Sequence, residues 1–137
     1  MAFLFTPSTN IAGPVVVKPQ VHSDERGWFL EAYKNSEFVS AGIHSHFVQI
    51  SHSLSRVKGT IRGLHFQVAP FAQGKLIACL RGTIFDVAVD LRRGSPTYLS
   101  YESVELSEEN KNLFWIPEGF AHGFCALQPD TTVAYFV

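Results

Sequence analysis

The residue types best suited to chemistry lie in two stretches of the chain. Residues 62–67 (RGLHFQ) and 73–76 (QGKL) bring an arginine, a histidine and a lysine within 14 residues, and Tyr135 lies near the end of the printed sequence. A histidine base, a lysine cation and a tyrosine acid can together move a proton next to a ketone and stabilise the enolate that forms. The pattern therefore favours proton-transfer chemistry at His65, Lys75 and Tyr135.

Each of these side chains also has an ordinary structural interpretation. A single strand histidine often belongs to the core or the surface, a lysine that opens an apolar strand is usually solvated, and a tyrosine in an alternating run can simply fill core. The polar groups that surround His65 favour the functional interpretation. Arg62 and His65 have opposite parity in a regular strand, so we expect a bulge or bend at Gly63 to turn both toward one pocket.

The rest of the sequence is typical of short strands separated by turns. The β-prone runs are residues 15–17, 27–32, 47–51, 59–66, 75–80, 83–91, 113–116 and 132–137. Gly, Pro, Asn or Ser fill the breaks between them, which is typical of a sandwich or barrel. We therefore expect one all-β domain over residues 1–137, a jelly-roll β-barrel with one or two short helical turns, near residues 35–41 and 107–112.

The clearest strand covers residues 83–92. Its side chains alternate with a period of two, with Phe85 and its neighbours on one face and the carboxylates of Asp86 and Asp90 on the other. We expect the two carboxylates to project to the same side of the sheet.

Composition limits the classes of function. A chain of 137 residues with 46% hydrophobic residues is long enough for one buried core. A net charge of −1 argues against a nucleic-acid surface, and no apolar run approaches the ~20 residues that span a bilayer. Residues 1–10 lack a secretory-signal pattern, so a cytoplasmic location is expected. Cys79 and Cys125 form no Cys-x-x-Cys motif and are expected to be buried free thiols.

One pattern resembles part of a metal site. The sequence PxGxxH that ends at His122 resembles the second metal motif of cupins. The first motif should supply His-x-His and then a glutamate, but the chain has His65 followed by Gln67. The His-x-His at His44 and His46 falls in an expected loop. Two ligands do not make a three- or four-ligand site, so we expect no metal.

A separate polar cluster in residues 24–31 is suited to a phosphate. The guanidinium of Arg26 could clamp a phosphate while an aromatic ring such as Phe29 lies against a base or a sugar. The structural alternative is a surface turn in which Arg26 pairs with Asp24 or Glu31.

Taken together, these motifs resemble the dTDP-4-dehydrorhamnose 3,5-epimerases, nucleotide-sugar epimerases of the cupin superfamily. The resemblance covers nearly the whole chain and rests on residues 24–31, 49–53, 59–67, 73–76, 86–96 and 115–124. It implies a cupin jelly roll that works as a homodimer without a cofactor or a metal. It also implies a dTDP-sugar substrate, dTDP-4-dehydro-6-deoxy-D-glucose, which is epimerised at C3 and C5 on the way to dTDP-L-rhamnose for polysaccharide and O-antigen synthesis.

The resemblance also implies roles for individual residues. His65 matches the family's base, Tyr135 its acid, and Lys75 the group near the C4 oxygen. The substrate-binding positions are matched by Arg26, Phe29, Glu31, Gln49, Ser51, Arg62 and His122. Ser51 stands where the family usually has asparagine.

The resemblance further implies more chain than is printed. The family continues beyond its tyrosine with late strands and an aspartate that pairs with the catalytic histidine. Because the sequence ends at Val137, we expect a fragment or a shortened homologue in which a barrel strand is left with an open edge. Asp86 is the one residue we identify as a possible substitute partner for His65.

Two alternatives remain open from the sequence. The first is a related deoxysugar enzyme, either an epimerase of C3 or C5 alone or a ketoisomerase. The second is a sugar-nucleotide binder without activity, or a metal-binding cupin. Hydrogen exchange at one sugar carbon or at both distinguishes the first from a 3,5-epimerase, and metal analysis with dTDP binding tests the second.

Overall fold

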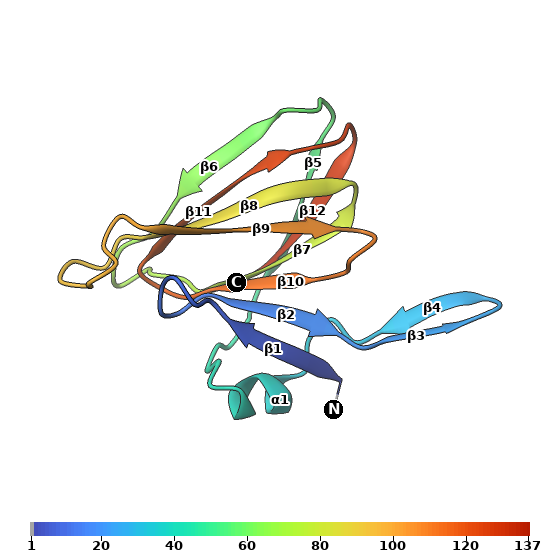
Figure 1. The fold of residues 1–137 in the computed structure, drawn as a ribbon, viewed down its shortest axis with the longest axis horizontal. Coiled ribbons are helices and arrows are strands. Elements are labelled where there is room, and N and C mark those ends of the chain that lie inside the picture. The colour runs from blue at the N-terminus through green and yellow to red at the C-terminus, as the bar shows by residue number, and fades with distance from the viewer. Residues whose placement is uncertain (1) are drawn as a thin grey trace.

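The computed structural model describes residues 2–137 and contains two antiparallel sheets that face each other (Figure 1). The larger sheet has the strand order β1 (Phe3–Pro7), β2 (Val15–Pro19), β10 (Leu113–Ile116), β7 (Lys75–Arg81), β12 (Thr131–Phe136), β5 (Ile50–Ser55). The smaller sheet has the order β6 (Ile61–His65), β11 (Phe120–Ala126), β8 (Thr83–Asp90), β9 (Tyr101–Ser107). A hairpin of β3 (Val21–Asp24) and β4 (Gly27–Leu30) projects from the body, and α1 (Asn35–Ser40) is the helix. The all-β prediction is confirmed.

The predicted strands are present, with some shifted ends. β10 has the predicted bounds, whereas the strand expected at residues 47–51 begins later, as β5. β1, β3, β9 and β11 were not predicted. In β11 Phe120, His122 and Phe124 lie on one face and small residues on the other, and both faces are almost entirely buried, so the sequence shows no alternation of polar and apolar residues. The turn expected near residues 107–112 is closed by a hydrogen bond from the Lys111 amide to the Ser107 carbonyl, without a helix.

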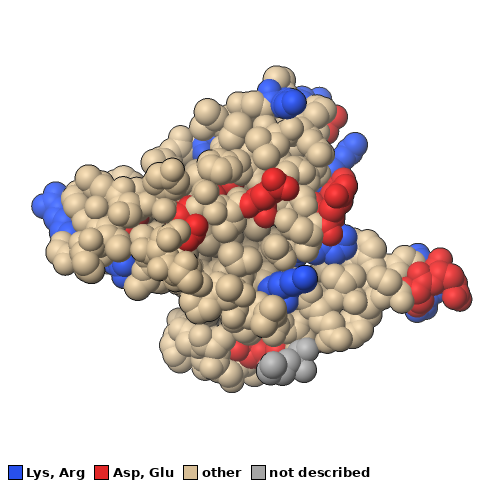
Figure 2. Space-filling model, in the orientation of Figure 1, with Lys and Arg blue, Asp and Glu red and all other residues tan. Residues whose placement is uncertain are grey.

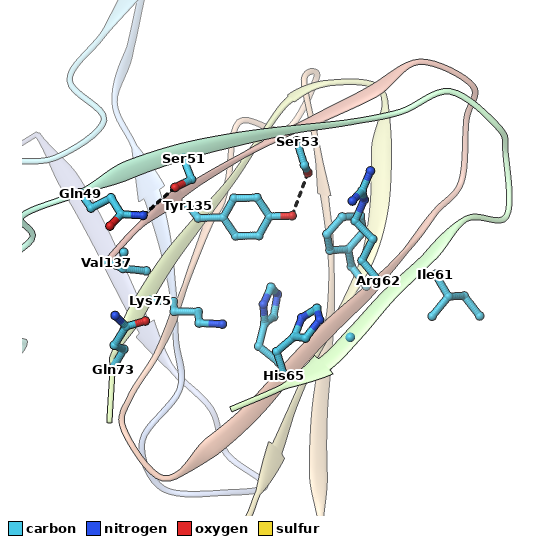
Figure 3. Close-up of a pocket in the computed structure, with 13 residues that line it drawn as sticks. Gln49, Ser51, Ser53, Ile61, Arg62, His65, Gln73, Lys75, Tyr135 and Val137 are labelled. Carbon is cyan, nitrogen blue, oxygen red and sulfur yellow. Dashed lines mark hydrogen bonds between the residues drawn. The ribbon is translucent and has the colours of Figure 1, made fainter. Parts of the chain in front are cut away.

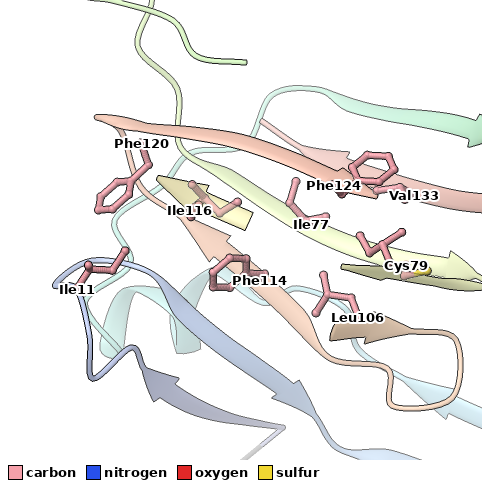
Figure 4. Close-up of a cluster of buried hydrophobic side chains, with 11 residues drawn as sticks. Ile11, Ile77, Cys79, Leu106, Phe114, Ile116, Phe120, Phe124 and Val133 are labelled. Atoms are coloured by element: carbon pink, nitrogen blue, oxygen red, sulfur yellow. The ribbon is translucent and has the colours of Figure 1, made fainter. Parts of the chain in front are cut away.

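The main core lies between the two sheets (Figure 4). Ile77 and Val133 reach it from the larger sheet, and Leu106 and Phe124 reach it from the smaller one. All four are nearly inaccessible to solvent, and burial of such side chains typically contributes about 1.5–3 kcal/mol each. This core fixes the distance between the sheets and so holds the strands that carry the candidate site.

A second cluster, rich in aromatic rings, covers the outer face of the larger sheet. Phe38 of α1 is fully buried there, with its ring centroid 5.2 Å from the centroids of Phe3 and Phe5. Tyr33 and Phe47 continue the chain of edge-to-face rings. The aromatic content of the sequence is thus used partly to hold α1 against the sheet.

The alternation predicted for β8 is confirmed, and its buried face is the one with the carboxylates. Asp86 and Asp90 are both fully buried, whereas Phe85 is 44% exposed. Asp90 accepts hydrogen bonds from Arg92, Ser95 and Thr97, and the guanidinium of Arg92 holds the pKa of Asp90 well below its usual value. A buried carboxylate needs such partners, because the charge has lost its water.

A barrel strand with an open edge is present, as expected: it is β5, which ends the larger sheet within residues 2–137. β12 is hydrogen-bonded on both sides, with Tyr135 opposite Ile77 of β7 and opposite Ser51 of β5. The long-range pairing with β5 therefore places β12 inside the larger sheet.

The cysteines are free, as predicted, but only Cys79 is buried and Cys125 is partly exposed. Burial raises the pKa of the Cys79 thiol to about 11, which makes it a poor nucleophile at neutral pH.

Two surface properties bear on partners. Within residues 2–137 there is no helix with the length and apolarity that a membrane crossing requires. On the face drawn in Figure 2, basic and acidic side chains are interspersed among uncharged residues, and the hairpin tip carries both signs.

Candidate active site

A cavity of about 550 Å³ lies between the two sheets, in the size range of small-molecule sites (Figure 3). Its walls come from β5, β7 and β12 of the larger sheet and from β6 and β11 of the smaller one. Seven of the ten predicted site residues line it: Gln49, Ser51, Arg62, His65, Lys75, His122 and Tyr135. The fold thus brings together most of the residues that sequence reasoning selected.

Tyr135 and Lys75 stand side by side on the larger sheet. Tyr135 is opposite Ile77, so Lys75, two residues before Ile77, is a diagonal neighbour on the same face. The Tyr135 hydroxyl shares a 2.8 Å hydrogen bond with the Ser53 hydroxyl (Figure 3). Burial raises the pKa of Tyr135, while the Ser53 hydrogen bond and the charge of Arg62 act in the opposite direction. At neutral pH the phenol is therefore protonated and able to donate.

Lys75 is half-buried, and two effects shift the pKa of its ammonium group in opposite directions. Burial lowers the pKa of its ammonium group, and the negative charge of Asp86 raises it. Figure 3 shows the amino group of Lys75 pointing into the cavity, between Tyr135 and His65. A cation at this place can stabilise an oxyanion that forms inside the cavity.

Arg62 and His65 reach the cavity because β6 contains the predicted bulge. Arg62 pairs with Phe124 and His65 with His122, so two residues of β6 stand opposite one residue of β11. Gly63, at φ +96°, is where β6 comes closest to β11, and a Cβ atom there would lie 2.5 Å from the His122 carbonyl oxygen. Only glycine fits this backbone position without displacing β11. The sequence prediction for this segment is confirmed.

Arg62 also connects the two sheets at the side of the cavity. Its Nε donates to the Ser55 hydroxyl at 3.0 Å, and its Nη2 donates to the Leu54 carbonyl at 2.9 Å. Because β5 and β6 belong to different sheets, these two hydrogen bonds join the wall with Tyr135 to the wall with His65. Arg62 therefore has a structural role as well as access to the cavity.

The structure assigns Asp86 to a different histidine from the one that we suggested. His122 Nε2 lies 2.6 Å from Asp86 Oδ1, and both side chains are almost fully buried. His65 is exposed and, within residues 2–137, its ring makes no side-chain hydrogen bond. The suggestion of Asp86 as partner of His65 is thus wrong, because β8 lies next to β11, which carries His122, and not next to β6.

Gln49 and Ser51 form a small polar group at the rim of the cavity. Gln49 Nε2 donates to the Ser51 hydroxyl at 3.0 Å. Ser53 and Gln73 also line the cavity, although sequence reasoning did not select them as site residues. The period of two in β5 could have identified Ser53, since it shares a face with Ser51.

Arg26, Phe29 and Glu31 do not reach the cavity. Arg26 lies at the tip of the projecting hairpin, where its exposed guanidinium forms an ion pair with Asp24. Phe29 is 65% exposed on β4, and Glu31 is exposed just after it. In this chain Arg26 is thus paired with Asp24 on a surface turn, and the hairpin that carries it projects from the body in Figure 1.

The histidines of the metal-like motifs are not gathered into a ligand set. Across residues 2–137, no three His, Cys, Asp or Glu side chains are grouped closely enough to hold a metal ion. His44 and His46 lie exposed in the loop before β5, where a loop was predicted, and His122 is hydrogen-bonded to Asp86.

Comparison with known proteins gives concordant matches. The family model for dTDP-4-dehydrorhamnose 3,5-epimerase matches residues 8–137. A dTDP-4-dehydrorhamnose 3,5-epimerase of Shigella flexneri is 49% identical over 128 residues, which cover 93% of this chain and 70% of the relative. The crystal structure of an epimerase of Legionella pneumophila in complex with dTDP-4-keto-L-rhamnose superimposes with a TM-score of 0.92 at 43% identity, over 98% of this chain and 70% of that one.

A more distant relative, with 31% identity, is a 3'-monoepimerase from Streptomyces bikiniensis. Its complex with dTDP has a TM-score of 0.89 and covers 96% of this chain and 65% of that one. The protein in that crystal is a double mutant in which a histidine is replaced by asparagine and a tyrosine, 70 positions later, by phenylalanine.

The structural matches show that the two-sheet barrel has the fold of these cupin-type epimerases. The match covers nearly all of this chain, and the cavity lies among the motifs that suggested the family. The chain belongs to the dTDP-4-dehydrorhamnose 3,5-epimerase family, a family of isomerases.

Proposed function

We propose that the chain epimerises dTDP-4-dehydro-6-deoxy-D-glucose at C3 and C5, with His65 as base, Tyr135 as acid and Lys75 beside the C4 oxygen. The observation that carries the proposal is the position of the two proton-transfer groups on different walls. His65 comes from β6 of the smaller sheet and Tyr135 from β12 of the larger one, and both line one cavity. A base and an acid on opposite sides of a sugar ring invert the carbon between them.

The proposed chemistry follows from the C4 ketone. The C–H bonds at C3 and C5 are acidic because both carbons are adjacent to the carbonyl group. His65 takes the proton as the C–H bond breaks, and the electron pair moves to the C4 oxygen as an enolate, which the Lys75 ammonium stabilises. The enolate then takes a proton from the Tyr135 hydroxyl at the other face of the carbon. Solvent protons reset both groups.

The Streptomyces relative supports the choice of base and acid. Its mutated histidine and tyrosine are 70 positions apart, the same separation as His65 and Tyr135. The dTDP-sugar bound by the Legionella relative supports the substrate class. Arg62, Gln49, Ser51 and His122 would contact the substrate in the cavity.

Deuterium exchange tests this proposal. The purified protein is mixed with the substrate in heavy water, and the C3 and C5 proton signals are followed by NMR. We expect exchange at both carbons in the parent protein. His65→Asn should abolish this exchange, and Tyr135→Phe should abolish formation of the inverted product. His52→Asn is the matched control, because His52 is an exposed histidine on β5. Persistent exchange in His65→Asn would disprove the base assignment, and exchange at only one carbon would favour a monoepimerase.

We also propose that the chain works as a homodimer in which the β3–β4 hairpin of one copy meets the cavity of the other. The three predicted substrate residues on and beside this hairpin lie outside the chain's own cavity. Trp28 and Phe29 are 60% and 65% exposed, which is unusual for two adjacent aromatic residues unless a partner covers them.

Subunit complementation tests the shared site. Arg26→Ala/Phe29→Ala and His65→Asn are each expected to be inactive as pure proteins. After unfolding and refolding together, random pairing should restore about a quarter of the sites, because each mixed dimer has one intact cavity that faces an intact hairpin. A mixture as inactive as its components would contradict the shared site.

A further inference from the structure

The cavity lies next to a buried carboxylate that the proposed proton transfers do not use. Asp86 is fully buried on the inner face of β8. Its strand register explains its partner: Asp86 stands opposite Phe124 and Ala88 stands opposite His122, so Asp86 and His122 are diagonal neighbours on one face. The small side chain of Ala88 leaves room for the imidazole, whose Nε2 lies 2.6 Å from Asp86 Oδ1.

This carboxylate is costly to keep in the interior. Its Oδ2 is buried and has no hydrogen-bond partner within residues 2–137. Burial raises the pKa of Asp86, and the imidazole of His122 and the charge of Lys75 act in the opposite direction. Asp90 on the same face of β8 differs, since three side chains donate hydrogen bonds to it. A group placed only for stability would have such partners.

The charge of Asp86 acts on the functional groups of the cavity. Burial lowers the pKa of Lys75, and the charge of Asp86 offsets part of that lowering; burial raises the pKa of Tyr135, and the charge of Asp86 adds to that rise. Both effects favour the forms that the proposed reaction needs, an ammonium ion at Lys75 and a neutral phenol at Tyr135. The positive charge of Arg62 lowers the pKa of Tyr135, so the charges of Arg62 and Asp86 act on this phenol in opposite directions.

We propose that Asp86 is a positioning residue of this site: its carboxylate accepts a hydrogen bond from the Nε2–H of His122, which fixes the imidazole at the cavity wall, and its negative charge stabilises the Lys75 ammonium group. Asp86 touches no reacting atom and acts through its two neighbours. This inference rests on the proposed function only for the catalytic roles of His122 and Lys75. The contacts and charges themselves can be measured without substrate.

The first measurement uses the unmodified protein. Nitrogen-15 NMR of the His122 ring at neutral pH reports which ring nitrogen holds the proton, and we expect a proton on Nε2. A ring protonated only on Nδ1 would overturn the proposal, because an imidazole in that form cannot donate to Asp86. This result does not depend on whether any variant folds or whether the sugar is turned over.

The second measurement compares Asp86→Asn with the matched control Asp90→Asn, which is equally buried on the same face of β8 but hydrogen-bonded to Arg92. Carbon-13 NMR of labelled lysine follows the pKa of Lys75. We expect it to fall in Asp86→Asn and to stay unchanged in Asp90→Asn. We also expect Asp86→Asn to be at least as stable as the parent protein, because the neutral amide costs less to bury than a carboxylate.

With the dTDP-sugar as substrate, we expect Asp86→Asn to lower kcat about tenfold or more, with a much smaller change in KM, and to move the alkaline limb of the pH–rate profile to lower pH. An unchanged Lys75 pKa in Asp86→Asn, or an equal fall in Asp90→Asn, would overturn the proposal. If the parent protein shows no exchange of the sugar, the proposed function fails, and the two NMR measurements still decide the role of Asp86.

Discussion

Replacement of Gly63 by alanine tests the contact that positions β6. The residue has φ +96°, and an added Cβ would lie 2.5 Å from the His122 carbonyl oxygen and 2.8 Å from the Gly123 Cα atom. The backbone conformation alone should cost about 1–3 kcal/mol for alanine. Overlap with backbone atoms, which cannot rotate away as a side chain would, should add about 1–3 kcal/mol. The total expected for Gly63→Ala is about 2–6 kcal/mol.

Gly59→Ala is the matched control for this experiment. Gly59 has a similar φ of +90°, just before β6, and no atom lies within 4 Å of its added Cβ. It should therefore show the backbone cost without the overlap. Urea unfolding of both variants, followed by the fluorescence of the buried Trp115, gives the difference directly, and we expect Gly63→Ala to be less stable by about 1–3 kcal/mol.

The same substitution should affect the site, because Arg62 and His65 flank Gly63 and both line the cavity. An overlap with β11 is relieved most easily by movement of β6, which among residues 2–137 has no neighbour on its other side in the sheet. Deuterium exchange into the sugar should therefore fall in Gly63→Ala and persist in Gly59→Ala. Equal stability of the two variants, together with full exchange in Gly63→Ala, would refute the role given to this contact.

Three further predictions concern individual contacts. Ser53→Ala removes a hydrogen bond that lowers the pKa of Tyr135, so carbon-13 NMR of labelled tyrosine should show this phenol titrating at higher pH, and an unchanged titration would contradict the contact. Asp90→Asn should destabilise the protein by about 1–3 kcal/mol at pH 7. Because the pKa of Asp90 is lowered in the folded state, this loss should shrink as the pH falls below the unfolded value of about 3.9, and urea unfolding that gives the same loss at pH 7 and pH 3 would argue against it. Arg26→Ala should leave the urea midpoint unchanged, since the ion pair with Asp24 is exposed, and should weaken calorimetric binding of dTDP; unchanged binding would remove Arg26 from the site.

Local patterns in the sequence determined several features of this protein. The alternation in residues 83–92 predicted which side chains of β8 share a face, because the direction of successive side chains in a strand depends only on the local backbone. The glycine between Arg62 and His65 predicted the bulge for the same reason. The ordered motifs also predicted the family, since the types and spacing of the residues are properties of the sequence itself.

Tertiary structure decided the partners. Which histidine Asp86 meets depends on the order of strands in the smaller sheet, where β11 lies between β6 and β8. The interior position of β12 depends on its pairing with β5, some 80 residues earlier in the chain. The separation of Arg26 from the cavity depends on the direction in which a hairpin leaves the body. These features arise from pairing between distant segments, and the free energy of that pairing is spread over whole sheets and cores, so no short stretch of sequence specifies it.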